Sequence, residues 1–179
     1  MRTALLVVDM QQGDFNRTPR YDAEGLVSRL NSLAARLRSS GGLVIYVQHD
    51  GPPGDLHHPD EPGWRLLPDL TPQEDDLFVR KTCCDAFLNT GLDNLLKAHG
   101  VGQVIVTGNA TDFCVDTTVR SAMARGYRTI VPTDGHTTAD RPYLSAIKII
   151  EHHHAVWREF ISPVGPALLM PCADIGVPA

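Results

Sequence analysis

The chain has 179 residues, of which 42% are hydrophobic and 21% are charged, the composition of an ordinary globular protein. Its 16 Lys and Arg against 21 Asp and Glu give a net charge of −5, without the basic excess that favours nucleic acids or anionic membranes. The apolar run at residues 4–8 is too short for a signal peptide or a membrane span, and four cysteines are too few for a secreted disulfide scaffold. We therefore expect one cytoplasmic domain over residues 1–179, with neither nucleic acid nor membrane as a partner.

Short β-branched runs alternate with helical stretches in the first part of the chain. Residues 5–8 and 44–47 are continuous apolar runs, which are typical of strands covered on both faces of a parallel sheet. Between them, leucines at 26, 30, 33 and 37 follow a helical spacing, and the glycines at 41 and 42 end the predicted helix. Residues 49–76 are polar and interrupted by six prolines. A loop of this length in a compact domain usually has a function.

The second part of the chain continues the alternation. Residues 77–79, 104–106 and 129–131 predict three further strands. Thr90 is expected to cap a helix that ends at Gly100, and a second helix is expected to end at Gly126. Residues 143–153 predict a helix, and residues 155–161 predict a last strand. This pattern predicts a three-layer α/β/α sandwich with a mostly parallel, Rossmann-like central sheet.

Three reactive side chains follow predicted strands: Asp9 after the first, Lys81 after the third and Cys114 after the fourth. In an open parallel sheet, ligands bind beyond the carboxyl ends of the strands. Each residue alone has an ordinary interpretation, as a turn carboxylate, a surface lysine or a small buried cysteine. A carboxylate, an ammonium group and a thiol at one edge of the sheet together indicate a catalytic site.

These three groups fit covalent catalysis by a thiol. A cysteine of ordinary pKa is only about 3% ionised at pH 7. We expect Lys81 and the start of the following helix to lower the pKa of Cys114, and a shift of two units would need about 2.7 kcal/mol. Asp9 could then accept the thiol proton and pass it to a leaving amine.

Three motifs, in order along the chain, resemble those of the isochorismatase-like cysteine hydrolases, a superfamily that includes nicotinamidases and N-carbamoylsarcosine amidase. They are LVVDMQ at residues 6–11, VRK at 79–81 with AF at 86–87 and TGL at 90–92, and TGNATDFCV at 107–115. The resemblance implies a triad of Asp9, Lys81 and Cys114. It also implies a cis peptide bond between Asn109 and Ala110, and an oxyanion hole made by the backbone N–H groups of Ala110 and Cys114.

The resemblance further implies hydrolysis of a small-molecule amide or ureido C–N bond through a thioester intermediate. Three other functions stay open: a metal-dependent nicotinamidase, an isochorismatase acting on a vinyl ether, and a non-enzymatic thiol sensor or ligand-binding module. The presence of Cys114 argues against vinyl-ether hydrolysis, which needs no cysteine nucleophile in this superfamily. The carboxylate of Asp9 argues against a sensor, because it would raise the pKa of a sensor thiol.

The long loop offers metal ligands by number alone: His49, Asp50, His57, His58 and Asp60. Nicotinamidases carry an Asp-x-His pair after the second strand, whereas Asp50 is followed here by Gly51 and Pro52. We therefore expect no metal and no other cofactor. Residues 152–154 are three consecutive histidines, which cannot share one face of a helix, so we expect one of them at an interface.

We expect the remaining site residues to surround a small-molecule substrate. The candidates for substrate contact are Gln11, Phe15, Trp64, Phe113 and His136. Loop packing is the alternative for the aromatic residues, and a turn role is the alternative for His136. The adjacent cysteines 83 and 84 are expected to pack beside Lys81. We also expect a homo-oligomer, either a dimer or a tetramer, whereas the identity of the substrate cannot be predicted from the sequence.

Overall fold

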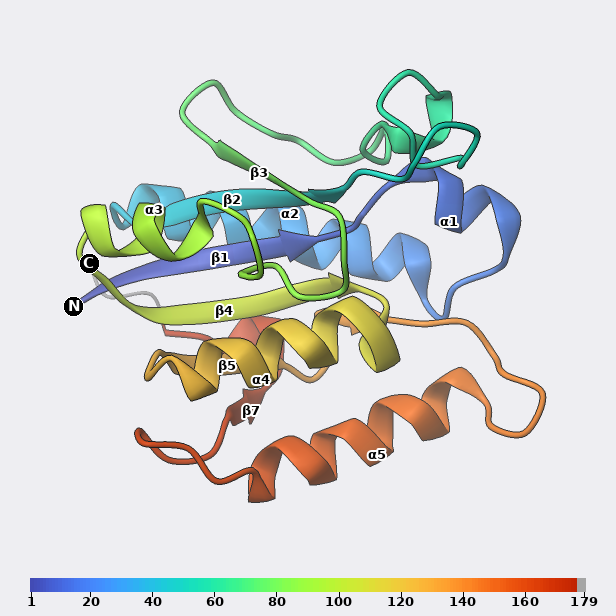
Figure 1. Cartoon of the computed structure of the whole chain (residues 1–179). Helices are drawn as coiled ribbons and strands as arrows, with labels where there is room; N and C mark the ends of the chain where they lie inside the picture. Colours follow the sequence, from blue (N-terminus) through green and yellow to red (C-terminus); the bar gives the residue numbers. More distant parts are fainter. Residues whose placement is uncertain (177–179) are drawn as a thin grey trace.

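A computed structural model describes residues 1–176 as a seven-stranded sheet with helices on both faces (Figure 1). The strand order is β3-β2-β1-β4-β5-β7, with β6 paired to the end of β4, and each of these strand pairs is parallel. The strands are β1 (Arg2–Val8), β2 (Leu43–His49), β3 (Leu77–Lys81), β4 (Val101–Asn109), β5 (Arg128–Pro132), β6 (His136–Thr137) and β7 (Leu168–Met170). The predicted three-layer α/β/α class is confirmed.

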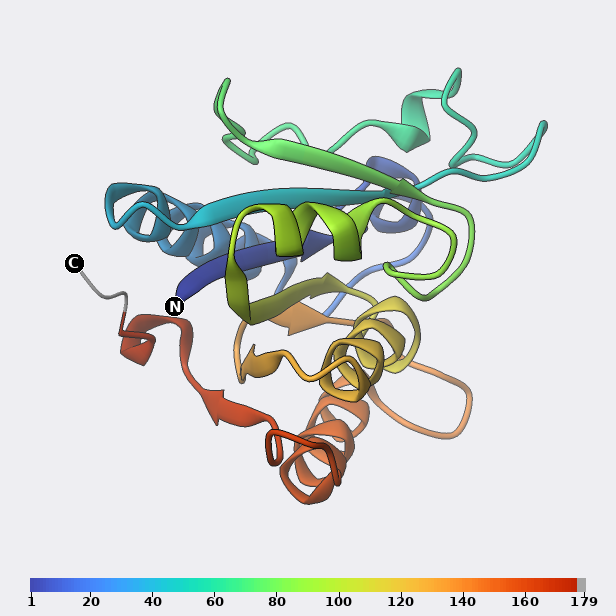
Figure 2. The ribbon, with the colours of Figure 1, turned by 60° about the vertical axis from the view of Figure 1, so that its left-hand side comes forward.

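The helices form the two outer layers (Figure 2). They are α1 (Gln12–Arg17), α2 (Ala23–Ser39), α3 (Leu92–Ala98), α4 (Asp116–Ala124) and α5 (Ala146–Glu159). Helix α2 packs on one face of the sheet, whereas α3, α4 and α5 contribute to the core on the other face. Three short turns complete the secondary structure: 3₁₀ turns at Pro62–Trp64 and Cys172–Asp174, and a π-helical turn at Thr111–Val115.

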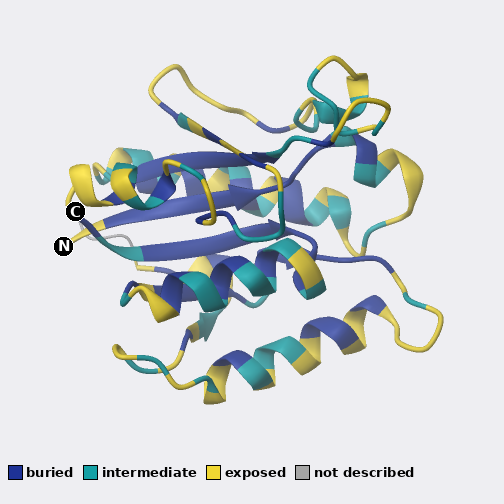
Figure 3. Ribbon diagram, viewed as in Figure 1, coloured by how far each residue is buried: buried dark blue, intermediate teal, exposed yellow. Residues whose placement is uncertain are grey.

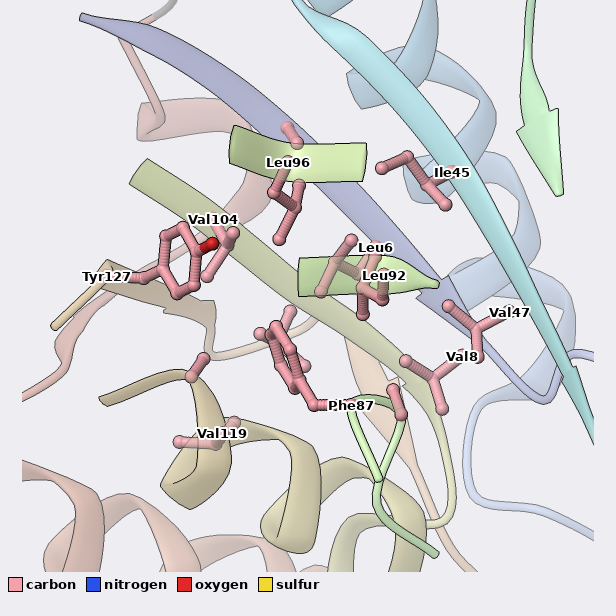
Figure 4. Close-up of a cluster of buried hydrophobic side chains, with 14 of the residues drawn as sticks. Leu6, Val8, Ile45, Val47, Phe87, Leu92, Leu96, Val104, Val119 and Tyr127 are labelled. Atoms are coloured by element: carbon pink, nitrogen blue, oxygen red, sulfur yellow. The ribbon is translucent and has the colours of Figure 1, made fainter. Parts of the chain in front are cut away.

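The side chains of β1 point alternately into two hydrophobic cores, one on each face of the sheet. Leu5 and Val7 belong to the cluster beneath α2, while Leu6 and Val8 belong to the cluster with α3 and α4. Figure 4 shows Leu6 and Val8 beside Phe87 in this second cluster. Because both faces are covered, the central strands are buried along almost their whole length (Figure 3). This explains why their sequences are continuous apolar runs rather than alternating ones.

The prediction of a last strand at residues 155–161 is wrong, because α5 continues to Glu159. Ile149, Ile150 and Trp157 are buried at helical spacing on one side of α5, and this packing extends the helix beyond the predicted residue 153. The helix begins at Ala146, whose backbone N–H donates to the side chain of Asp140 at 2.7 Å. The last strand is β7, which pairs with β5.

Other predicted boundaries lie within a few residues of the structure. Helix α3 begins at Leu92, and the hydroxyl of Thr90 accepts a hydrogen bond from the N–H of Leu92 at 3.2 Å. Within residues 1–176, no helix is both long enough and apolar enough to cross a membrane. The expected domain ends at residue 179, and residues 177–179 lie outside the described part of the chain.

The sheet order brings the ends of three strands together. Strand β1 lies between β2 and β4, and His49 at the end of β2 is paired with Lys81 at the end of β3. The long loop after β2 and helix α1 lie at this same edge, on the right in Figure 1. The carboxyl ends of β1, β3 and β4 therefore form the floor of one site.

Candidate active site

Asp9 follows β1 directly and is only 5% exposed. Its backbone has a φ of 47°, in the left-handed region that Asp tolerates better than most residues. The backbone N–H of Asp9 donates to the carbonyl of Val47 at 2.8 Å, which fixes the turn. One carboxylate oxygen, Oδ2, accepts a hydrogen bond from Lys81 at 2.6 Å.

Lys81 ends β3 and is 1% exposed. Its ammonium group donates to Asp9 Oδ2 at 2.6 Å, to the carbonyl of Cys83 at 3.0 Å and to Cys114 Sγ at 3.2 Å. These three acceptors match the three donors of an ammonium group, so the buried cation is fully hydrogen-bonded. The backbone of Cys83 thus lies beside Lys81, as predicted for the cysteine pair.

Cys114 lies on the turn Thr111–Val115, between the end of β4 and the start of α4. The peptide bond between Asn109 and Ala110 is cis. Gly108 brings this segment against β1: its φ is 116°, and a Cβ there would lie 2.0 Å from the carbonyl oxygen of Val8. Only glycine permits this close approach, which sets the cysteine turn next to Asp9.

Asp9 and Cys114 face a pocket of about 320 Å³, and Lys81 is buried behind them. Asp9, His49, Ala110, Phe113 and Cys114 line it from or just beyond the strand ends, and His57 lines it from the long loop. The rest of its wall is formed by Gln11, Asp14, Arg20, Cys84 and Arg141. Residues from six separate stretches of the chain therefore enclose a space of the size that a small molecule fills.

Burial dominates the protonation equilibria of the triad. It raises the pKa of Asp9, and the Lys81 ammonium offsets only part of this effect. Burial, followed by the Asp9 carboxylate, raises the pKa of the Cys114 thiol, and Lys81 acts in the opposite direction. The expectation that the pKa of Cys114 is lowered is therefore wrong. For Lys81, burial acts to lower the pKa, but Asp9 and Cys114 together raise it, so the lysine stays charged.

Two buried side-chain polar atoms within residues 1–176 have no hydrogen-bond partner: Asp9 Oδ1 and His49 Nδ1. Both belong to residues that line the pocket. A buried polar atom left unpaired is costly, typically about 1–3 kcal/mol, and a catalytic role is one explanation for such an atom. Asp9 Oδ1 is thus free to exchange a proton with a group in the pocket.

The isochorismatase domain model matches residues 3–158. The chain belongs to the isochorismatase family. It is 40% identical over 140 residues to a streptothricin hydrolase of Streptomyces noursei, covering 78% of this chain and 51% of that protein. It is 29% identical over 170 residues to the ureidoacrylate amidohydrolase of Klebsiella pneumoniae, covering 74% of this chain and 72% of that protein.

The structure of N-carbamoylsarcosine amidase from Thermoplasma acidophilum has the same fold as this isochorismatase-family chain. The TM-score is 0.79 at 26% identity, and the match covers 98% of this chain and 99% of that one. The chain spans about half the length of the streptothricin hydrolases that it matches.

Gln11, predicted to bind substrate, lines the pocket of this family member but uses its amide elsewhere. Its Oε1 accepts from the N–H of His49 at 2.8 Å, and its Nε2 donates to the carbonyls of His49 at 3.0 Å and Trp64 at 2.9 Å. Gln11 therefore holds the long loop in place. Phe113 does line the pocket and is half exposed, as a substrate contact requires.

Three predicted substrate contacts do not line this pocket. Phe15 lines a separate hollow of about 630 Å³ on the α2 side. The indole N–H of Trp64 donates to Asp50 at 2.8 Å, and the guanidinium of Arg80 lies over its ring. His136 is buried beneath the cysteine turn and lines a third hollow. The structure therefore places these three side chains away from the pocket that Asp9 and Cys114 line.

Sequence reasoning missed two arginines and a carboxylate in the wall. Arg20 donates to Asn109 Oδ1 at 2.9 Å and pairs with Asp14 at 3.3 Å, next to the cis peptide bond. Arg141 pairs with Asp112 at 2.9 Å, and its guanidinium lies over the ring of Phe113. These residues belong to no motif and follow no predicted strand, so only the tertiary structure reveals them.

Four of the five residues considered as metal ligands have partners of their own, and the fifth is His49, whose buried Nδ1 is unpaired within the described part of the chain. Asp50 binds Trp64 and Arg80, His58 lies near Asp60, and the ring of His57 lies between Asp55 and Asp14. Within residues 1–176, no group of three or more His, Cys, Asp or Glu side chains is arranged to hold a metal ion.

Proposed function

We propose that the chain hydrolyses the C–N bond of a small amide or ureido compound, with Cys114 as the nucleophile and without a metal ion. One observation carries the proposal: the buried ammonium of Lys81 lies 2.6 Å from the Asp9 carboxylate and 3.2 Å from the Cys114 sulfur. Relatives named streptothricin hydrolase, ureidoacrylate amidohydrolase and N-carbamoylsarcosine amidase support this class of reaction.

The reaction begins with a protonated thiol, since burial and Asp9 both raise the pKa of Cys114. As the sulfur attacks the substrate carbonyl carbon, the thiol proton passes to Asp9. The raised pKa of Asp9 makes its carboxylate a better base than an exposed one, and its Oδ1 has no other partner. The backbone N–H groups of Ala110 and Cys114 then stabilise the oxyanion.

Asp9 completes both halves of the reaction. It donates its proton to the leaving nitrogen as the C–N bond breaks, which leaves a thioester on Cys114 and an ionised carboxylate. The carboxylate then removes a proton from water as the water oxygen attacks the thioester carbonyl. When the C–S bond breaks, the proton returns to the sulfur and the acid product leaves.

Lys81 keeps its proton throughout, because the carboxylate and the sulfur raise its pKa. Its positive charge stabilises whichever of its two partners is negative at each stage. It also fixes the positions of Asp9 and Cys114 by hydrogen bonds to both. Lys81 therefore acts electrostatically and transfers no proton.

We also propose that copies of the chain associate in the cytoplasm. Tyr143, Leu144 and Ile147 are neighbouring apolar side chains at the start of α5, with exposed fractions of 97%, 44% and 38%. Exposed apolar patches commonly form subunit contacts.

All four cysteines are free thiols, which is typical of a reducing compartment such as the cytoplasm. Light scattering of the purified chain measures the number of copies, and a monomer at all concentrations would contradict the association.

A substrate screen tests the proposed activity. Small primary amides, carbamoyl and ureido compounds and nicotinamide are offered to the wild-type chain and to Cys114→Ala, and the release of ammonia or amine is measured. We expect release by the wild type for at least one amide or ureido compound, and none by Cys114→Ala. Equal release by both proteins would overturn the proposal, as would vinyl-ether hydrolysis without any C–N cleavage.

A further inference from the structure

The turn that carries Cys114 is held by a segment outside the triad, residues 136–141. Strand β6 pairs with the end of β4, with His136 opposite Gly108 and Thr137 opposite Asn109. The N–H of Gly108 also donates to the carbonyl of Gly135 at 3.0 Å. The main chain just before the cis peptide bond is therefore fixed from one side by β6.

His136 extends this contact to the cysteine turn itself. Its Nδ1 lies 2.8 Å from the hydroxyl oxygen of Thr111, the first residue of the turn. Its Nε2 lies 3.0 Å from Nε2 of His154 on α5, and its ring packs edge-on against Trp157 at 5.2 Å between centroids. Thr111 and Trp157 are fully buried and His136 is 4% exposed. One histidine of the sequence 152–154, the half-buried His154, therefore contacts the residue that holds the cysteine turn.

The next residue of the turn is held by the same segment. Asp112 accepts a hydrogen bond from the hydroxyl of Thr138 at 2.6 Å and two from the guanidinium of Arg141, at 2.9 and 3.1 Å. Two consecutive residues of the turn are thus held by the segment 136–141. Thr111 is bound by His136, and Asp112 is bound by Thr138 and Arg141. This arrangement fixes the direction of the backbone from Ala110 to Cys114.

The two imidazoles are neutral in this arrangement. Burial lowers the pKa of His136 to about 3 and that of His154 to about 4, so neither ring is charged near neutral pH. In the pair of Nε2 atoms of His136 and His154, one is protonated and donates a hydrogen bond, and the other accepts this bond. Thr111, His136 and His154 form an uncharged chain of hydrogen bonds that takes no part in the proton transfers of the triad.

We propose that His136 is a positioning residue for the oxyanion hole, acting through its hydrogen bond to Thr111 and oriented by His154. The inference rests on the proposed function, because it concerns the backbone N–H groups of Ala110 and Cys114. The triad side chains do not contact His136 in the described structure. Loss of the bond to Thr111 therefore shifts the backbone oxyanion donors, while the hydrogen bonds from Lys81 still hold the Cys114 sulfur and the Asp9 carboxylate.

The experiment compares two reactions of Cys114 that differ in their need for an oxyanion hole. 4-Nitrophenyl acetate acylates the thiol through a tetrahedral oxyanion: the S–C bond forms, the C–O bond breaks and 4-nitrophenolate leaves. Iodoacetamide alkylates the same thiol by displacement of iodide, without an oxyanion. Stopped-flow absorbance at 400 nm and intact-mass spectra give the two rate constants for each folded variant.

Paired variants separate position from packing. Thr111→Val removes the hydroxyl at nearly constant shape, and Thr111→Ser keeps it. His136→Phe removes both ring nitrogens, and His136→Asn keeps a polar group near the place of Nδ1. His152→Gln, an exposed neighbour of the histidine pair, is the control.

We expect Thr111→Val and His136→Phe to acylate about a hundredfold more slowly, the typical cost of a catalytic group misplaced by about 1 Å. Their alkylation rates should stay within about twofold of the wild type, since alkylation forms no oxyanion. Thr111→Ser, His136→Asn and His152→Gln should resemble the wild type in both reactions. Thr111→Val remains informative if His136→Phe fails to fold.

Three results would overturn the inference. The first is acylation of Thr111→Val at the wild-type rate. The second is an equal slowing of acylation and alkylation, which would indicate general disorder of the site. The third is a lower free energy of unfolding with both rates unchanged, which would indicate a purely structural role. A different result refutes the proposed function itself: wild-type chain that is alkylated by iodoacetamide but never acylated at Cys114. The two failures are therefore distinguishable.

Discussion

Replacing Asp9 by asparagine tests the two roles of the buried ion pair. The substitution keeps the shape of the side chain but removes the base and the later acid, so kcat should fall by about 10²–10⁴. It also leaves the Lys81 ammonium buried without its counter-charge. At the observed 2.6 Å and an effective dielectric constant of about 20, the attraction between the two charges is about 6 kcal/mol. Breaking one half of a buried pair typically lowers the free energy of unfolding by about 3–5 kcal/mol.

A double variant separates activity from stability. In Asp9→Asn with Lys81→Met, both charges are gone and no unpaired charge remains buried. The loss of stability should then be smaller than the sum of the two single losses by about 3 kcal/mol, the size of coupling expected for residues in direct contact. Activity should stay as low as in Asp9→Asn, because the proton carrier is still missing.

The assay combines urea unfolding followed by tryptophan fluorescence with kcat measured on the substrate found in the screen. Asp76→Asn is the matched control: Asp76 is 7% exposed and pairs with Arg38 at 2.6 Å, and neither residue lines the pocket. This control should lose stability but keep kcat. The reasoning is refuted if Asp9→Asn keeps kcat within about threefold of the wild type, or if the double variant regains activity.

Three further predictions concern pH, metal and the pocket wall. Because the pKa of His136 is about 3 in the folded chain and 6.5 is its ordinary value, the unfolded state binds the extra proton between these values, and stability falls as the pH drops through this window. Urea unfolding at pH 6 and pH 4 gives the dependence of the free energy of unfolding on pH. This dependence should be weaker in His136→Asn than in the wild type by about 1.4 kcal/mol per pH unit, and an equal dependence in both proteins would contradict the prediction. Dialysis against a chelator should leave activity unchanged with less than about one metal per ten chains, whereas stoichiometric zinc or iron that restores lost activity would favour a nicotinamidase. Phe113→Ala should raise KM about tenfold while Phe15→Ala leaves KM unchanged, and equal effects would refute the assignment of the pocket.

The architecture could be predicted because the strands bury both of their faces. The continuous apolar runs at residues 5–8, 44–47 and 104–106 all lie within buried strands. The segment at 155–161 could not be assigned in this way, because a short apolar stretch fits a strand and a helix equally. Only the packing of Trp157 against the core decides for the helix.

The meeting of Asp9, Lys81 and Cys114 was predictable from a single topological rule, since each lies at or beyond the carboxyl end of a strand in a parallel sheet. The pKa of Cys114 was not predictable, because it depends on how completely the folded protein buries the thiol. The positions of Trp64 and His136 outside the pocket were not predictable for a related reason. The direction of each side chain is set by partners far away in the sequence, Asp50 for Trp64 and Thr111 with His154 for His136.

The covalent intermediate on Cys114 is the central claim, and intact-mass spectrometry after rapid acid quenching measures it directly. With a slowly hydrolysed substrate, the wild-type chain should gain the mass of the acyl group, and peptide mapping should locate that mass on Cys114. Asp9→Asn should form and release the adduct more slowly, because Asp9 serves acylation and thioester hydrolysis alike. Turnover of the substrate without any acyl adduct, or with an adduct of equal size on Cys114→Ala, would contradict the account.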